Sequence, residues 1–230
     1  MNKRNPTELA DAFRGNIDDL LTFHAELIEC AVSGGNQSVL ASLVFHRAYV
    51  YLETFLSDWF TAAINRDSTV FRASREQKIR DSISSKFSAW DVGQLSYSPP
   101  AHLTLEQIGQ LLDPTRRNTT FGSYSKFVEA ANSNLAAPFA TKVTAVPNNR
   151  RRILDAAKAI RNCISHQSDS SRDKMNQQLT SLPVTGNCGR LRRRVNAVRY
   201  VGSYLKSAAG SETRLEIYLH EFDQLALNLR

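Results

Sequence analysis

Apolar residues follow helical spacing along most of the chain. Residues 7–32 place Leu9, Phe13 and Ile17 at steps of four and continue in steps of three or four until a Ser-Gly-Gly sequence. Such spacing puts the apolar side chains on one face of a helix. We therefore expect an amphipathic helix over 7–32, with Thr7 as its cap.

The strongest helical pattern in the chain covers residues 38–64. Its apolar positions fall within about 80° of one line when each residue advances by ~100°. A stripe this wide and this aromatic predicts a long helix at the centre of the core. Its members are Leu40, Val44, Ala48, Leu52, Phe55, Leu56, Trp59 and Ala63.

Weaker patterns predict further helices over 73–89, from Thr104, over 123–133, over 149–166 and from Ser211 or Thr213 to the last residues. Residues 136–149 are expected to form an irregular connector, and 167–189 a polar loop with one or two helical turns. Residues 190–208 fit either a helix or two short strands, since Val and Tyr favour strands. The pattern predicts an all-α bundle of about five to seven helices with a long central helix. We expect one domain over 1–230, with an irregular middle region at 90–147 and a polar and basic insertion at 167–210.

Composition fits a folded soluble protein, with 42% hydrophobic and 22% charged residues. No uncharged apolar run approaches the ~20 residues that span a bilayer, and the start of the chain lacks a signal-peptide pattern. We expect no membrane association and a cytoplasmic location.

The three cysteines, Cys30, Cys163 and Cys188, lack disulfide or zinc-ligand spacing. The sequence predicts no metal site and no cofactor, and Cys163 is expected to be a buried thiol rather than a nucleophile.

Positive charge is concentrated in the second half of the chain. Residues 1–115 hold 10 Lys and Arg against 14 Asp and Glu, whereas residues 116–230 hold 19 against 8. The basic residues gather at 115–118, 148–154 and 189–200. Each cluster alone could be a solvated surface, but three of them favour an anionic polymer as partner. The candidate RNA-binding residues are Arg150, Arg151, Arg152, Arg190, Arg192, Arg193, Arg194 and Arg199.

The predicted helix over 149–166 ends in a polar constellation. Asn162 and His166 lie one turn apart on the polar face, whereas Arg161 lies about 40° from the centre of the apolar face. A guanidinium there must be paired with an acid or must face a cleft where its charge has a use. Otherwise its long stem lies on the core and its charged head reaches solvent. Glu53, on the flank of the central helix, is the candidate partner.

These residues carry a family resemblance. A central helix of the form HRAYVYLETFLSDWF, followed much later by a helix that ends IRNCISH, resembles the HEPN superfamily of all-α proteins. Its motif, an arginine, a polar residue, three further positions and a histidine, falls on Arg161, Asn162 and His166. The resemblance covers about residues 10–66 and 149–228. Residues 90–147 have no counterpart, and the insertion at 167–210 departs from the family pattern.

The resemblance implies a metal-independent endoribonuclease that acts as a toxin or an antiviral defence effector. It also implies a homodimer that brings two motifs together, and a possible antitoxin or defence-system partner. RNA cleavage by its own 2′-OH needs a base, an acid and a cation near the phosphorane. His166 and its counterpart in a second copy would divide the proton transfers, Arg161 would stabilise the phosphorane, and Asn162 would orient His166 or hold the phosphate.

Two alternatives remain open from the sequence. The first is a non-catalytic HEPN-like module that binds RNA, a nucleotide or a partner enzyme. The second is a nucleic-acid-binding regulator that works through the arginines at 190–199, although no helix-turn-helix or zinc motif supports it.

Overall fold

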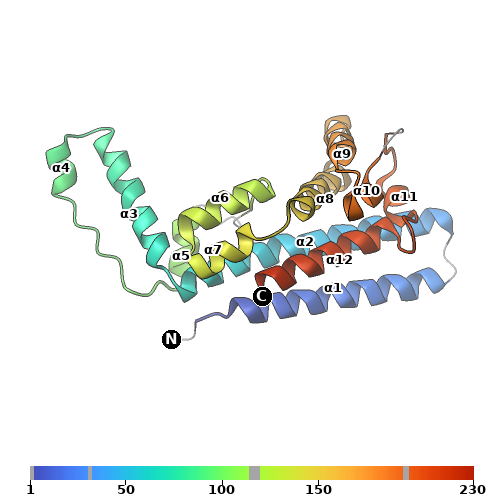
Figure 1. Ribbon diagram of the computed structural model, residues 1–230, viewed down its shortest axis with the longest axis horizontal. Coiled ribbons are helices and arrows are strands. Elements are labelled where there is room, and N and C mark those ends of the chain that lie inside the picture. The colour runs from blue at the N-terminus through green and yellow to red at the C-terminus, as the bar shows by residue number, and fades with distance from the viewer. Residues whose placement is uncertain (1–2, 31–32, 114–119, 194–196) are drawn as a thin grey trace.

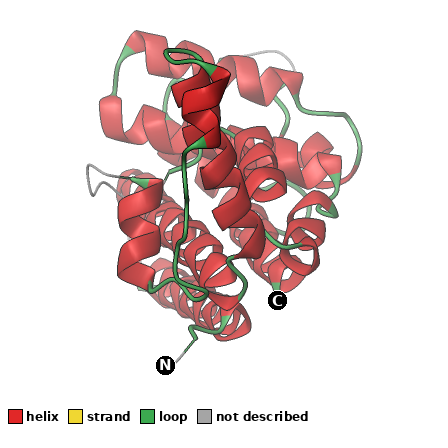
Figure 2. Ribbon diagram, turned by 90° about the vertical axis from the view of Figure 1, so that its left-hand side faces the viewer, coloured by secondary structure: helices red, strands yellow, loops and turns green. Residues whose placement is uncertain are grey.

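The computed structural model describes residues 3–30, 33–113, 120–193 and 197–230, and these form twelve helices (Figure 1). The all-α prediction is confirmed: the described residues contain no strand, only an isolated bridge between Ala208 and Thr213 (Figure 2). The expected number of helices, five to seven, was too low. The helices are α1 (Pro6–Glu29), α2 (Gly34–Arg66), α3 (Thr69–Ser84), α4 (Ala89–Gly93), α5 (Leu105–Leu112), α6 (Tyr124–Asn134), α7 (Ala137–Thr144), α8 (Asn148–His166), α9 (Asp169–Ser181), α10 (Gly186–Leu191), α11 (Val201–Lys206) and α12 (Arg214–Leu229).

Helix α2 is the central helix, as its apolar stripe predicted. It packs against α1, α8, α11 and α12, and its buried residues extend over most of its length. Aromatic pairs join these helices: Phe55 stacks on Phe13 of α1 with ring centroids 4.6 Å apart, and Phe45 meets Tyr218 of α12 edge to face at 5.3 Å. Trp59 is fully buried and donates its indole N–H to the carbonyl of Leu229 at 3.0 Å. By length and composition, α2 alone among the described helices could also cross a membrane, a property that it shares with core helices of soluble proteins.

Local capping chemistry sets where the main helices begin. Thr104 and Thr213 each form a capping box with the residue three positions on, as the sequence suggested for both starts. The expected cap at Thr7 was wrong. Asn5 caps α1 and accepts a hydrogen bond from the backbone N–H of Thr7, because Pro6 occupies the first turn, where its missing N–H costs nothing.

Two segments expected to be irregular are helical. Within residues 136–149, α7 forms with a proline in its first turn, and Val143 is buried. Within the supposed polar loop, α9 runs for 13 residues and buries Met175 and Leu179, which lie one turn apart. The ambiguous segment contains helix α11 and, in its described part, no strand. In Figure 1, α3 and α4 extend away from the bundle, whereas α8 and α9 lie above α2 and α12.

Candidate active site

Helix α8 carries the polar constellation on the edge of the bundle. Its buried face contains Ile153, Leu154, Ala157 and Ile160, as the helical wheel predicted. The helix ends at His166, and the next residue, Gln167, adopts a left-handed conformation with φ of 50° and donates its N–H to the carbonyl of Cys163. Helix α9 starts two residues later, so the last turn of α8 lies at a tight corner between two packed helices.

Arg161 is bound by the two residues that the sequence placed around it. One terminal nitrogen, Nη2, lies 2.6 Å from Oε2 of Glu53, and the other, Nη1, donates to Oδ1 of Asn162 at 3.0 Å. The predicted ion pair with Glu53 is thus present, between side chains that are 26% and 21% exposed. The guanidinium carbon also lies 5.9 Å from the ring centroid of Tyr49, within range of a cation–π contact.

The environment of Arg161 fixes its orientation but leaves it partly open to solvent. Burial, with a smaller contribution from the Glu53 charge, raises the pKa of Tyr49 well above the ordinary tyrosine value, so this ring stays neutral. The neutral ring of Tyr49 and the carboxylate of Glu53 hold the Arg161 side chain in one rotamer. The quarter of the side chain that remains exposed can meet an anion.

His166 and Asn162 open onto one polar pocket of about 520 Å³ between α8 and α9. His166 is exposed at the end of α8. The structure therefore links Arg161 to both Glu53 and Asn162 by hydrogen bonds. His166 shares the pocket with Asn162, whereas Arg161 and Glu53 are not among its described lining residues. Besides His166 and Asn162, the pocket is lined by Gly122, Ser123, Asp155, Lys158, Ala159, Ser168, Ser170, Ser171, Lys174, Gln177 and Gln178.

Two lysines of this pocket were missed from the sequence. Lys158 lies one turn before Asn162 on α8, so helical spacing could have identified it, and its ammonium donates to the carbonyl of Phe121. Lys174 lies on α9. Because this segment was expected to be a loop, the sequence did not show which way Lys174 would face. Asp155 is the one carboxylate in the lining. Burial raises its pKa above the ordinary value, although the N–H of Tyr124, at 2.8 Å, opposes that rise.

Three of the arginines assigned to RNA binding make contacts within the protein. Arg150 donates to Glu221 at 2.7 Å, and Arg151 donates to backbone carbonyls of Thr144 and Val146. Arg190 contacts Glu212 at 2.8 Å and also donates to the carbonyl of Ala209. These donors are occupied by the protein itself.

The other arginines of these clusters differ in exposure. Arg152 and Arg199 are exposed, whereas Arg192 and Arg193 are half-buried, each with an Nε that has no hydrogen-bond partner among the described residues. Arg194 and the basic cluster at 115–118 lie outside the described residues.

Cys163 does not behave as a nucleophile would. It is buried, and burial raises the pKa of its thiol, which disfavours the reactive thiolate. In the part of the chain that the structure describes, no group of three or more His, Cys, Asp or Glu side chains is placed to hold a metal ion.

A scan against protein-family models, a search of curated proteins and a search of solved structures find no match to this chain. The function is therefore inferred from the site itself and from the motif at the end of α8.

Proposed function

We propose that the protein is a metal-independent endoribonuclease of the HEPN type, with Arg161, Asn162 and His166 at its active centre. One observation carries the proposal: an arginine fixed by Glu53 on the central helix donates to Asn162, and Asn162 opens onto the same pocket as His166. Cleavage of RNA by its own 2′-OH requires a base, an acid and a cation near the phosphorane; an imidazole can transfer the protons, a fixed guanidinium can supply the cation, and the amide can orient the phosphate.

The reaction follows from these groups. A histidine removes the proton of the 2′-OH, whose oxygen attacks phosphorus while the bond from phosphorus to the 5′-oxygen breaks. A second proton carrier protonates that leaving oxygen, so the products are a 2′,3′-cyclic phosphate and a 5′-OH. Arg161 stabilises the negative charge of the phosphorane, and Asn162 orients the phosphate. Because each chain supplies one His166, the proposal places the second imidazole on a second copy, in a homodimer with a composite site.

The test is cleavage of single-stranded RNA in EDTA by the wild type and by His166→Ala and Arg161→Ala. We expect wild-type activity in EDTA, cyclic phosphate ends detected by mass spectrometry, and a loss of about 10²–10⁴-fold in His166→Ala. A DNA strand of the same sequence should resist, because it lacks the 2′-OH. His220→Ala is the matched control, since His220 is exposed and contacts Glu212 away from this pocket.

Equal cleavage by wild type and His166→Ala would refute the assignment. If the natural target is a special RNA, growth arrest on expression, relieved by the same two substitutions, provides the corresponding test. A monomeric mass at the concentration of the assay, together with full activity, would contradict the composite site.

The lining of the pocket also favours a second function, an RNA- or nucleotide-binding module without catalysis. Lys158, Lys174 and two glutamines can bind a phosphate or a base without any proton transfer. Tight binding of RNA by the wild type without any cleavage, in EDTA or in Mg²⁺, would favour this function over the nuclease.

A further inference from the structure

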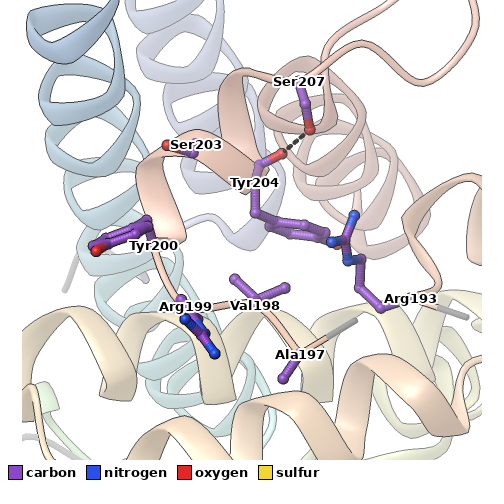
Figure 3. A pocket seen from close by; sticks show the side chains of 8 residues that line it. All are labelled: Arg193, Ala197, Val198, Arg199, Tyr200, Ser203, Tyr204 and Ser207. Carbon is purple, nitrogen blue, oxygen red and sulfur yellow. Dashed lines mark hydrogen bonds between the residues drawn. The ribbon is translucent and has the colours of Figure 1, made fainter. Parts of the chain in front are cut away.

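A second depression lies around the start of α11. Figure 3 shows its described lining, with Arg193 next to the ring of Tyr204, and with Arg199 and Tyr200 on the stretch of chain that leads into α11. A neighbouring depression shares Arg199, Tyr200 and Ser203 and extends to the start of α2 and the end of α8. We call the two together the Tyr200 hollow.

The Tyr200 hollow is suited to a polyanion. Its described lining includes Arg172, Arg193 and Arg199 but no carboxylate. Of these, Arg172 contacts Asp169 at 2.7 Å, a pair on the surface whose acid is 90% exposed. Arg199 is exposed. A surface with several guanidinium groups and no acid attracts phosphates.

Tyr200 gives the hollow an aromatic platform. Its side chain is 77% exposed, more than any other large apolar or aromatic side chain of the described residues. Exposing a ring to this degree forfeits the stabilisation that its burial would give. An exposed aromatic ring beside arginines is the arrangement on which unpaired bases stack.

The platform is held on the rigid part of the molecule. Helix α11 packs on α2 so closely that a Cβ at Gly202 would lie 1.9 Å from the carbonyl oxygen of Ser38. The hydroxyl of Tyr204, which is buried, donates to the carbonyl of Leu191 at 2.7 Å. Tyr200 precedes the first residue of this anchored helix, so its backbone is fixed while its ring faces solvent.

The hollow adjoins the motif. Its lining includes Cys163, Ile164 and Gln167 from the end of α8, and Gln167 follows His166 in the chain. The last turn of α8 thus has the polar pocket on one side and the Tyr200 hollow on the other. A strand bound in one can continue over this turn into the other.

We infer that the Tyr200 hollow binds single-stranded RNA next to the cleavage site, with an unpaired base stacked on Tyr200 and the adjoining phosphates on Arg199 and Arg193. This inference rests on the proposed function, because it describes how the substrate of that site is held. A duplex does not fit, since its bases are already stacked on each other.

The experiment measures RNA affinity in the full-length His166→Ala protein, so that cleavage cannot interfere. A short RNA with 2-aminopurine is titrated by anisotropy and by fluorescence quenching, which reports stacking. Adding Tyr200→Ala should weaken binding roughly tenfold and abolish the quenching, whereas Tyr200→Phe should preserve both. Arg199→Ala should lower the slope of log Kd against log salt concentration by about 0.7.

Two matched controls lie far from the hollow. Trp90→Ala removes the similarly exposed ring of α4, and Arg66→Ala removes an exposed arginine from the opposite end of α2. Both should bind RNA with the affinity of the His166→Ala protein, and circular dichroism should show that all variants are folded.

The outcomes separate this inference from the nuclease proposal. Wild type that fails to cleave, with Tyr200-dependent binding retained, refutes the nuclease and supports the hollow. Cleavage by wild type, with Tyr200→Ala binding and quenching like its parent, overturns the hollow and leaves the nuclease intact. A change of oligomeric state in Tyr200→Ala without a change in RNA affinity would show that the hollow is a protein interface, and would also overturn the inference.

Discussion

The two ends of α8 use arginine differently. Near its start, Arg150 binds Glu221 of α12 and Arg151 binds carbonyls of the preceding turn, so these cations fasten the helix to the bundle. Near its end, Arg161 binds Glu53 and Asn162 but keeps about a quarter of its side chain exposed, and Asn162 lines a polar pocket. The same residue type stabilises the fold at one end and faces solvent at the other. A cluster of arginines in a sequence therefore indicates a ligand only where its donors are not used within the chain.

The largest expected effect concerns Glu53, which acts as a positioning residue for Arg161. Glu53→Ala should lower kcat about 100-fold with little change in KM, because a guanidinium that moves by ~1 Å no longer matches the phosphorane. Glu53→Gln keeps an oxygen acceptor for Arg161, and its kcat should fall about tenfold. Steady-state kinetics on single-stranded RNA provides the measurement.

Asp58→Asn is the control for Glu53. Asp58 also lies on α2 and also binds an arginine, Arg4 at 2.9 Å, but both side chains are about 40% exposed. Exposed pairs contribute little, and this variant should match wild type. If Glu53→Ala also cleaves at the wild-type rate, Arg161 does not depend on its partner and the contrast between the two ends of α8 disappears.

A smaller effect is expected at the start of α8. Arg150→Ala should lower the free energy of unfolding by about 2 kcal/mol, since it leaves the largely buried carboxylate of Glu221 with one donor, Asn187. Urea unfolding measures the loss, and cleavage per folded molecule should not change.

The neighbouring Arg152 provides the comparison for Arg150. It is exposed, and Arg152→Ala should change stability by less than about 0.5 kcal/mol. If Arg150→Ala weakens RNA binding while stability stays at the wild-type value, Arg150 belongs to the RNA-binding surface that the sequence suggested.

The smallest effect is expected in the middle of α8, at Asp155. Its pKa is raised by burial, so on raising the pH the unfolded chain loses this proton first and the native state is then disfavoured. Wild type should therefore lose stability relative to Asp155→Asn as pH rises from the ordinary carboxyl pKa of ~4 to the raised value, and the difference should be constant above it. Asparagine retains an oxygen for the N–H of Tyr124. Urea unfolding of both proteins at several pH values tests this, and a difference that does not vary with pH would contradict it.

Sequence patterns predicted the elements whose apolar residues repeat over many turns. Helices α1, α2, α8 and α12 bury one long face each, and that periodicity is visible in the chain. Helix α9 escaped notice because only Met175 and Leu179 are buried along 13 mostly polar residues. Helix α7 is eight residues long and has a proline at its second position, so its sequence resembled a connector. Short helices that depend on tertiary contacts leave little periodic signal.

The candidate site was predictable in part for the same reason. The face of Arg161 on α8 and the flank of Glu53 on α2 follow from helical geometry, and the ion pair between them was foreseen. Lys174 was not predicted as part of the site, because helix α9, which carries it, was not predicted. The contacts that occupy Arg150 and Arg190 join segments 71 and 22 residues apart, and sequence spacing does not reveal which acid each arginine meets.

The continuity of α2 sets a fixed length within the molecule. Ser38, against which α11 packs, and Glu53, which holds Arg161, lie on one unbroken helix, and fifteen residues at about 1.5 Å each separate them by about 22 Å along its axis. Had these two residues stood on helices joined by a loop, that interval could vary with every fluctuation of the loop. Here α2 keeps a fixed distance between Ser38, against which α11 packs, and Glu53, which binds the motif arginine.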